Sequence, residues 1–425
     1  MKVLIITLNA WSDTGSTGNT ISNVFGDATD IQFANLYCRN EPINNNLCHT
    51  YYKITEDQII KSLIGKKAGK SFELADPHQK TDIAFNPLSN GGLGNFLRKY
   101  RPTFLLFLRE LVWLLPVWKN KGLRAWLKAY NPAIVYMHGH TNIYMHRIME
   151  YCTRVTGAKI VMFFGDDMYG RKTHSPVGYL YESLYRRRLR RSIAISSLLF
   201  GGSTKLCEEY SKLFHKEFHP MFKQCDLSGL QGKTTINNPI TIVYAGNLLF
   251  GREDVICSLI EVLKKVNNLD LIYKLKLLIY SNTIPSSSSL KILNDGVNSV
   301  YMGCKPYSII CECMNKSDMS LFLESFNKEN IKKTRLSFST KIIDCMQSDS
   351  AMLAIGPAQI ASMDYVIKNN IGITATSMDE AYQVLKNICE HPQAILSSID
   401  IKTAFATQHH TKKSKEYMNQ IKAII

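Results

Sequence analysis

Each half of the chain begins with a short apolar run, followed by a glycine-containing loop and then a helical pattern. This repeated order limits the possible folds more than any other feature. In the first half the run is 1–8, with Gly15 and Gly18 in the loop that follows; in the second half, 240–246 combines a run and its glycine. Strand, loop and helix in this order open a βα unit of Rossmann type. A strict G-x-G-x-x-G fingerprint is absent, so a dinucleotide site is not indicated.

Further strand-like runs alternate with helical stretches along both halves. They lie at 133–138, 159–164, 192–196, 276–280, 300–303, 319–323, 351–355 and 371–374. Such alternation predicts parallel sheets with crossover helices, and a polar stretch near 224–239 predicts a linker. We therefore expect an α/β protein with Rossmann-like domains at 1–230 and 238–400. A helix at 401–425 is expected to pack back on the first domain.

Charge and cysteine usage narrow the expected partners and location. The 425-residue chain has a formal net charge of +16, which favours nucleic acid, nucleotides or an anionic membrane surface. It has no RNP-like aromatic motif and no helix-turn-helix signature, so nucleic acid is not expected. The 11 cysteines are scattered and lack metal-ligand spacing. This pattern favours a reducing, cytoplasmic setting without a structural metal.

The stretch 104–118 is almost entirely apolar and has basic residues on both sides. At 15 residues it is shorter than the roughly 20 needed to span a bilayer. One interpretation is a helix lying in a membrane interface, anchored by Trp113 and Trp118. The other is a core-facing helix of the first domain, and the sequence leaves both open.

Polar residues follow two of the predicted strands of the first half. His138 ends one strand, and Asp166 and Asp167 follow another. Ligands of open α/β sheets lie beyond the carboxyl ends of strands, so these residues are candidates for substrate binding. The alternatives are a structural histidine and carboxylates that cap a turn. The run 186–191, with five arginines, is either a solvated helix face or a surface for anionic lipids.

In the second half, Ser339 and Thr340 precede an apolar helical pattern that includes Lys341 and Asp344. Serine or threonine in this place predicts an N-cap, and a helix N-terminus with a neighbouring lysine is suited to an anion such as phosphate. Asp344 is placed to accept hydrogen bonds from ribose hydroxyls. An ordinary capped helix is the alternative.

Taken together, several motifs of the second half resemble glycosyltransferase family 4. They are Tyr244-Ala245-Gly246-Asn247 with Arg252, Gly303-Cys304-Lys305-Pro306-Tyr307, Asp318, and 337–344. The resemblance implies the GT-B fold, in which two Rossmann-like domains face each other across a cleft. It also implies that the second domain holds most of a nucleotide-sugar donor.

The resemblance assigns roles to individual residues of the second half. Gly246 matches a glycine that lets the loop approach the diphosphate, and Arg252 matches the basic residue that grips it. Asn247 stands where the family often has a second cation, for which Lys341 would substitute. Asp344 matches the second carboxylate of an E-x7-E pattern, whereas Leu336 stands where the first glutamate is expected. Glu324 is the nearest upstream carboxylate, but its spacing does not fit.

From the first half, His138 matches a histidine that lies against the donor sugar. The implied catalytic residues are thus His138, Arg252 and Lys341. The implied donor-binding residues are Gly246, Asn247, Lys305, Ser339, Thr340 and Asp344. The implied acceptor-binding residues are Gly15, Gly18, Asn19, Asp166 and Asp167.

The expected activity is transfer of a sugar with retention from a nucleotide sugar to a saccharide, without a metal or other cofactor. The acceptor is expected to be a saccharide or one linked to undecaprenyl diphosphate, in synthesis of a capsule or O-antigen. The protein would then work at the inner face of the plasma membrane, touching it through 104–118. A member that binds a nucleotide sugar without turnover is the alternative, because Leu336 and Asn247 depart from the family pattern.

Overall fold

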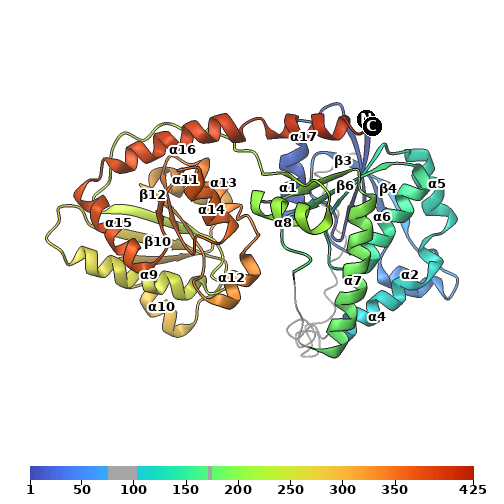
Figure 1. The fold of residues 1–425 in the computed structure, drawn as a ribbon, viewed down its shortest axis with the longest axis horizontal. Coiled ribbons are helices and arrows are strands. Elements are labelled where there is room, and N and C mark those ends of the chain that lie inside the picture. The colour runs from blue at the N-terminus through green and yellow to red at the C-terminus, as the bar shows by residue number, and fades with distance from the viewer. Residues whose placement is uncertain (75–102, 171–174) are drawn as a thin grey trace. The chain divides into compact units, whose positions relative to one another are not determined.

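A computed structural model describes residues 1–74, 103–170 and 175–425 of the chain, except for the side chains of 103–106 (Figure 1). These residues form two compact units. Unit 1 comprises Met1–Met221 together with Ser414–Ile425, and unit 2 comprises Phe222–Lys413. The chain therefore passes from unit 1 to unit 2 at 221, against a predicted domain end at 230.

Unit 1 is built on an eight-stranded sheet in the order β4-β3-β2-β1-β5-β6-β7-β8. Its strands are β1 (Lys2–Thr7), β2 (Gln32–Tyr37), β3 (Cys48–Lys53), β4 (Lys70–Glu73), β5 (Ile134–His138), β6 (Lys159–Phe164), β7 (Leu198–Gly201) and β8 (His219–Pro220). Neighbouring strands are parallel except for the antiparallel pair β3 and β4. The central strands β1, β2 and β5 are buried along nearly their whole length, as expected where helices cover both faces of a parallel sheet.

The helices of unit 1 connect these strands as the alternation predicts. They are α1 (Ser16–Phe25), α2 (Glu56–Ser62), α4 (Thr103–Leu114), the short 3-10 helix η1 (Pro116–Trp118), α5 (Lys121–Tyr130), α6 (Ile143–Thr156), α7 (Pro176–Ile195), α8 (Thr204–Phe214) and α17 (Lys413–Lys422). The last helix contributes Tyr417, Met418 and Ile421 to the same core as the first strand. The segment predicted at 401–425 is therefore divided: its first part belongs to unit 2 and its last part to unit 1.

Unit 2 has a six-stranded parallel sheet in the order β11-β10-β9-β12-β13-β14. The strands are β9 (Ile240–Ala245), β10 (Leu275–Tyr280), β11 (Ser299–Gly303), β12 (Met319–Leu323), β13 (Ala351–Ile355) and β14 (Ile373–Ala375). The helices are α9 (Arg252–Asn267), α10 (Ser287–Leu293), α11 (Tyr307–Lys316), α12 (Lys328–Thr334), α13 (Lys341–Met346), α14 (Ala361–Lys368), α15 (Met378–Glu390) and α16 (Ala394–His410). Numbered within the unit, the strand order is 3-2-1-4-5-6, the Rossmann arrangement.

One expectation for 104–118, that its tryptophans anchor a membrane interface, is wrong. Trp113 and Trp118 do not anchor a membrane interface, because both indole rings are fully buried. The Trp113 ring stacks on Tyr144 with centroids 4.2 Å apart, and its Nε1 donates to Glu56 Oε1 at 3.1 Å. Trp118 Nε1 donates to the Trp113 carbonyl at 3.1 Å. Among the residues that the structure describes, no helix has the length and hydropathy of a membrane span.

The strand predicted at 192–196 is also wrong, because α7 continues to Ile195 and β7 begins only at Leu198. Ser192 is buried inside the helix packing, where its hydroxyl bonds His146 Nδ1 at 3.0 Å. The arginines of 186–191 are largely engaged within the unit. Arg188 and Arg191 pair with Glu150. The guanidinium groups of Arg186 and Arg190 lie over the ring of Tyr169.

Candidate active site

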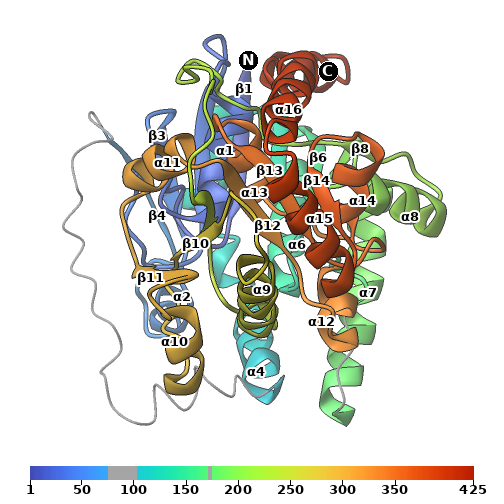
Figure 2. The same cartoon turned by 90° about the vertical axis from the view of Figure 1, so that its left-hand side faces the viewer.

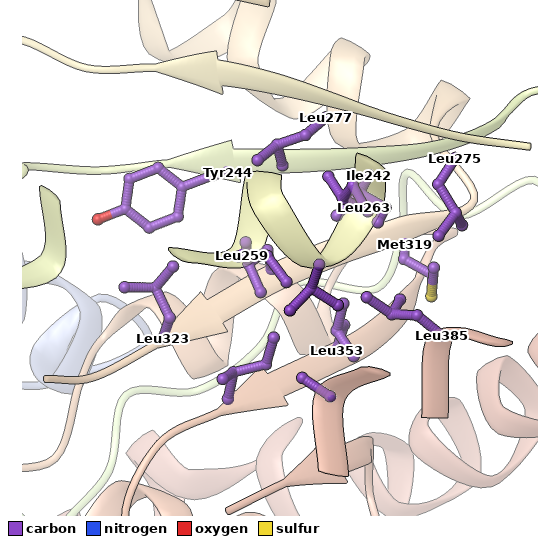
Figure 3. Close-up of a cluster of buried hydrophobic side chains, with 14 of the residues drawn as sticks. Ile242, Tyr244, Leu259, Leu263, Leu275, Leu277, Met319, Leu323, Leu353 and Leu385 are labelled. Carbon is purple, nitrogen blue, oxygen red and sulfur yellow. The ribbon is translucent and has the colours of Figure 1, made fainter. Parts of the chain in front are cut away.

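In unit 2 the strand order reverses between β9 and β12, which is the switch point where open α/β sheets bind ligands. The loop after β9 leads into α9, and the loop after β12 leads toward α12 and α13. Tyr244, near the end of β9, is fully buried. Figure 3 shows its ring at the edge of the leucine-rich core with the hydroxyl directed away from Leu259 and Leu263. A polar cluster begins at this hydroxyl.

Lys341, the first residue of α13, crosses to the loop after β9. Its Nζ donates to the Tyr244 hydroxyl at 2.9 Å and lies 4.6 Å from the ring centroid. A Cβ on Gly246 would lie 2.1 Å from the lysine Cε and Nζ, so a larger residue there would displace the end of this side chain from its present position. Burial, helped by the positive charge of Arg252, lowers the pKa of Lys341 to about 7. The lysine therefore titrates near neutral pH.

Arg252, the first residue of α9, is a second buried cation in this cluster. Its Nη2 donates to Glu324 Oε1 at 2.7 Å, and its Nη1 donates to Asn247 Oδ1 at 2.9 Å. The Tyr244 hydroxyl in turn donates to the Asn247 carbonyl at 2.6 Å. Asn247, which stands where the resemblance implies a second cation, thus orients Arg252 instead of adding a charge.

Two atoms of this ion pair have no hydrogen-bond partner among the described residues. They are Arg252 Nε and Glu324 Oε2, and both are buried. Buried polar atoms in native proteins are almost always paired, so unpaired ones mark sites that receive a ligand or water. The site brings together a guanidinium, an ammonium group and a carboxylate with unused hydrogen-bonding capacity.

Asp344 lies one helical turn beyond Lys341 on α13. Its Oδ1 accepts from the Tyr307 hydroxyl at 3.0 Å, and Gln347 Nε2 donates to the same hydroxyl at 3.0 Å. Burial raises the pKa of Asp344, opposed by the Tyr307 hydrogen bond and by the positive charges of Lys223 and Lys341. The aspartate and the cationic pair therefore belong to one electrostatic cluster.

The N-cap predicted at Ser339 and Thr340 does not form. Thr340 occupies the cap position with helical φ and ψ of −62° and −17°, and its side chain makes no capping hydrogen bond. The Ser339 N–H instead donates to Ser362 Oγ at 2.9 Å. α13 is only six residues long, so it has little macrodipole to offer an anion. Lys341, and not the helix N-terminus, is therefore the group of this stretch that is suited to an anion.

The remaining positions of the donor motif differ in their surroundings. Leu336, at the place of the expected glutamate, is buried. Lys305 is exposed on the loop between β11 and α11. Sequence reasoning missed Glu324 as a partner of Arg252, although its position directly after β12 was a usable signal, because it lies at the carboxyl end of a strand at the switch point.

In unit 1 the switch point lies between β1 and β5, and His138 is the last residue of β5. Its ring lies 4.9 Å from Phe163 and 5.5 Å from Tyr136, and its Nε2 has no partner among the described residues. Burial lowers the pKa of His138 to about 4, so the imidazole is neutral at neutral pH. A neutral ring with one unpaired nitrogen is suited to a hydrogen bond with a ligand hydroxyl.

Of the two glycines in the loop after β1, only Gly18 is required for packing. A Cβ on Gly18 would lie 2.1 Å from the Ser12 carbonyl oxygen, so this glycine is required for α1 to approach the loop. Gly15 precedes α1 with an ordinary φ of −98°. Asn19 is exposed on the first turns of that helix.

The two aspartates after β6 have different surroundings. Asp167 Oδ1 accepts from the Gly170 N–H at 2.8 Å and from the Tyr210 hydroxyl at 2.8 Å. It therefore caps the turn, as the alternative interpretation held. Asp166 is exposed. Within the described ranges, no group of three or more histidine, cysteine, aspartate or glutamate side chains is placed to hold a metal ion.

The chain folds into two Rossmann-like units, and solved glycosyltransferase structures match it over its whole length. Together these observations define the fold as GT-B, the fold of a large group of glycosyltransferases. The similar structures include sucrose-phosphate synthase from Thermosynechococcus elongatus, with a TM-score of 0.63, 9% identity and coverage of 100% of this chain and 98% of that one. HepE from Anabaena in complex with UDP and glucose gives a TM-score of 0.61 at 10% identity, with both chains covered in full. The lipopolysaccharide outer core galactosyltransferase WaaB gives 0.60 at 13% identity, again with full coverage. No protein-family model and no curated protein matches the sequence.

Proposed function

We propose that the protein is a glycosyltransferase that takes a sugar from a nucleotide-sugar donor, with the donor diphosphate bound by Arg252 and Lys341. The observation that carries this proposal is the pair of cations at the switch point of unit 2, formed by buried Arg252 and by half-buried Lys341, whose side chain passes beside Gly246. Phosphate is the anion that such a pair recognises most readily. HepE, which has the same fold, was crystallised with UDP and glucose.

The chemistry that follows from these groups is stabilisation of a leaving group. When the bond between the sugar and the diphosphate breaks, negative charge builds on the diphosphate oxygens. Two preorganised cations in a water-poor site lower the energy of that charge without a metal ion. We propose metal-independent transfer with retention of the sugar configuration, as in glycosyltransferase family 4, with His138 as a further catalytic residue.

Asp344 is proposed to bind the donor ribose. In the structure its Oδ1 is held by the Tyr307 hydroxyl, an arrangement in which a ribose hydroxyl would be an equivalent donor. Tyr307 is itself 60% exposed, so its ring can move without disturbing the core. The proposal extends the donor site from the cations along α13.

For the acceptor we propose a saccharide, free or carried on undecaprenyl diphosphate, in the synthesis of a surface polysaccharide such as capsule or O-antigen. The support is the resemblance to glycosyltransferase family 4 and the structural similarity to a lipopolysaccharide galactosyltransferase. The exposed Asn19 and Asp166 are the proposed acceptor contacts. A cytoplasmic location at the inner face of the plasma membrane is part of this proposal.

The decisive experiment measures binding and transfer with the same protein samples. Calorimetry with UDP and with UDP-glucose should give saturable binding, and Lys341→Met should weaken it by about tenfold or more, as expected when a charged hydrogen-bonding partner is removed. The matched control is Lys332→Met, because Lys332 is an exposed lysine of unit 2 paired only with Glu329. Equal affinities in both variants would reject the proposed donor site.

A second function is a protein that binds a nucleotide sugar without transferring it. Buried Leu336 favours this alternative, because an apolar side chain replaces a carboxylate expected near the donor sugar. Radiolabelled sugar transfer to extracted lipid-linked saccharides separates the two. Donor binding without any transfer or donor hydrolysis would support the non-catalytic protein.

A further inference from the structure

Helix α4 turns two charged residues inward beside buried Trp113 and exposes leucines on its outward face. Arg109 and Glu110 point into unit 1, where Glu110 Oε1 and Oε2 accept from the backbone N–H groups of Ile143 and Tyr144 at 2.8 and 3.0 Å. Arg109 lies over the Tyr144 ring and donates to Asn142. The side chains that α4 turns outward are leucines, at 108, 111 and 114. A soluble helix normally turns polar side chains outward.

The first half of α7 continues this apolar exposure. Val177, Leu180 and Leu184 are exposed, while Tyr181 is buried against α4. The Tyr181 hydroxyl donates to Glu110 Oε1 at 3.1 Å, and its ring lies 6.4 Å from Phe107. Figures 1 and 2 both show α4 beside the first turns of α7 at one end of the unit. Two contacting helices therefore expose apolar stripes in the same region.

We call the six side chains the leucine face: Leu108, Leu111, Leu114, Val177, Leu180 and Leu184. Each is between 41% and 54% exposed. The exposure is not relieved by rotating α4, because such a rotation would break the contacts of Glu110 with the start of α6. Contiguous apolar surface that stays exposed among the described residues is typical of an interaction site.

We propose that the leucine face docks on an anionic lipid bilayer. The charges around it are those that such a surface attracts. Helix α2, which packs against α4 through the Glu56–Trp113 hydrogen bond, pairs its own Lys61 with Asp57 and is followed by exposed Lys66 and Lys67. Exposed Lys119 and Lys121 follow α4, within a chain whose net charge is +16. Anionic lipids attract such cations, and for this reason we favour a lipid surface over a protein partner.

Two further observations fit lipid better than a second copy of the chain. Ile60, Leu63 and Ile64 extend the apolar exposure onto α2 beside these lysines. Tyr179, near the start of α7, is 59% exposed, and tyrosine is a side chain that favours the lipid–water boundary. Apolar side chains surrounded by cations are the pattern of helices that lie in an interface. The anchor is thus formed by leucines, and the buried tryptophans hold the helices in place.

The experiment is co-sedimentation of the full chain with vesicles of phosphatidylcholine alone or mixed with phosphatidylglycerol. We expect binding to the mixed vesicles that weakens with added salt. The double variant Leu111→Asp/Leu180→Asp should reduce it by about tenfold or more, because each aspartate opposes insertion and anionic lipid together. The matched control, Ile284→Asp/Val297→Asp, changes two exposed apolar residues of unit 2 and should bind like the wild type.

Three outcomes would overturn the proposal. The wild type could fail to sediment with mixed vesicles, or the double variant could sediment as well as its control. Without lipid, a concentration-dependent dimer that the double variant abolishes would identify a second copy as the occupant. Because no nucleotide is present, the result is independent of the donor site: a protein that binds UDP but not vesicles keeps the proposed donor site and sugar transfer, and loses this docking surface and the proposed membrane location.

Discussion

The proposed donor site predicts that the protonation of Lys341 makes UDP binding depend on pH. In the free protein burial lowers the pKa of this lysine to about 7, whereas a bound diphosphate would raise it. Above that pH the lysine must take up a proton to bind the anion, so affinity for UDP should fall by up to about tenfold per pH unit. Calorimetric titrations from about pH 6 to about pH 9 measure this slope. Lys341→Arg should flatten it, because arginine stays charged.

The same lysine has a testable effect on folding. Because its pKa is lower in the folded state than the ordinary 10.5, the unfolded chain holds more protons between these values, and stability due to this group rises with pH from about 7 to 10.5. At neutral pH and below, the buried cation therefore opposes folding. Lys341→Met should melt at the same or a higher temperature while binding UDP poorly. A clear loss of thermal stability would mean that Lys341 is structural.

Arg252 and Glu324 are coupled through their 2.7 Å ion pair. Arg252→Met should cost roughly 3–5 kcal/mol of stability, because it leaves the buried carboxylate unpaired. Adding Glu324→Gln should restore much of that stability, yet UDP binding should remain weak in both variants. Denaturant unfolding and calorimetry on the same samples check the two effects. Recovery of UDP binding in the double variant would show that Arg252 does not touch the donor.

At this scale the sequence identified residue types better than their arrangement. Arg252, Lys341 and Asp344 were predicted as candidates and lie in one electrostatic cluster of unit 2. The partnership of Arg252 with Glu324 joins residues 72 positions apart, so no local spacing encodes it. The expected cap at Thr340 failed for a different reason: Thr340 has helical backbone angles, and the N–H groups of Ile342 and Ile343 bond the carbonyls of Ser339 and Thr340 at 3.1 and 3.0 Å.

At the scale of elements, α4 supplies the cap of α6 in place of a local residue. Asn142, at the N-cap position of α6, makes no side-chain capping hydrogen bond, and Glu110 accepts from the first backbone N–H groups. Glu110→Ala should therefore leave buried donors unpaired and cost about 1–3 kcal/mol for each. Thermal or denaturant unfolding gives the measurement. Glu261→Ala, which removes only an exposed pair with Lys264, should change stability little.

The strands of both units were largely predictable because parallel strands are apolar on both faces and end in polar loops. The segments β6, β12 and β13 begin and end where the apolar runs do. The first half gave two errors. The first is the strand predicted at 192–196, which is part of α7 because buried Ser192 bonds His146. The second concerns 104–118, where Arg109 and Glu110 have the character of surface residues although Glu110 faces the interior and bonds the Ile143 N–H. In each case a tertiary hydrogen bond decided the orientation.

At the scale of the whole molecule, the last helix completes the core of unit 1. Tyr417, Met418 and Ile421 are buried there, and Ser414 Oγ donates to the Val24 carbonyl at 2.7 Å. A chain ending at Lys413 loses three buried side chains, each of a type worth about 2–5 kcal/mol when removed from a core. Hydrogen exchange followed by mass spectrometry should show faster exchange throughout unit 1 and little change in unit 2.

A chain that lacks only Ile425 is the control for this truncation, because that residue is exposed. It should exchange like the full chain. Equal acceleration in both units of the truncated protein would instead mean that the two unfold as one cooperative block. UDP should still slow exchange near Lys341 in the truncated chain, because its partners Tyr244, Gly246 and Arg252 all belong to unit 2.

The chain leaves unit 1 at 221 and returns to it at 414, so unit 2 is inserted into unit 1. During synthesis on the ribosome, this order delays completion of unit 1. At about 5–20 residues per second, synthesis of Phe222–Lys413 takes roughly 10–40 s, during which the first 221 residues stand without their last helix. The apolar groove that Tyr417, Met418 and Ile421 will fill is open to chaperones throughout that interval. Unit 2 is therefore the first to be complete, and unit 1, which contains both chain ends, is the last.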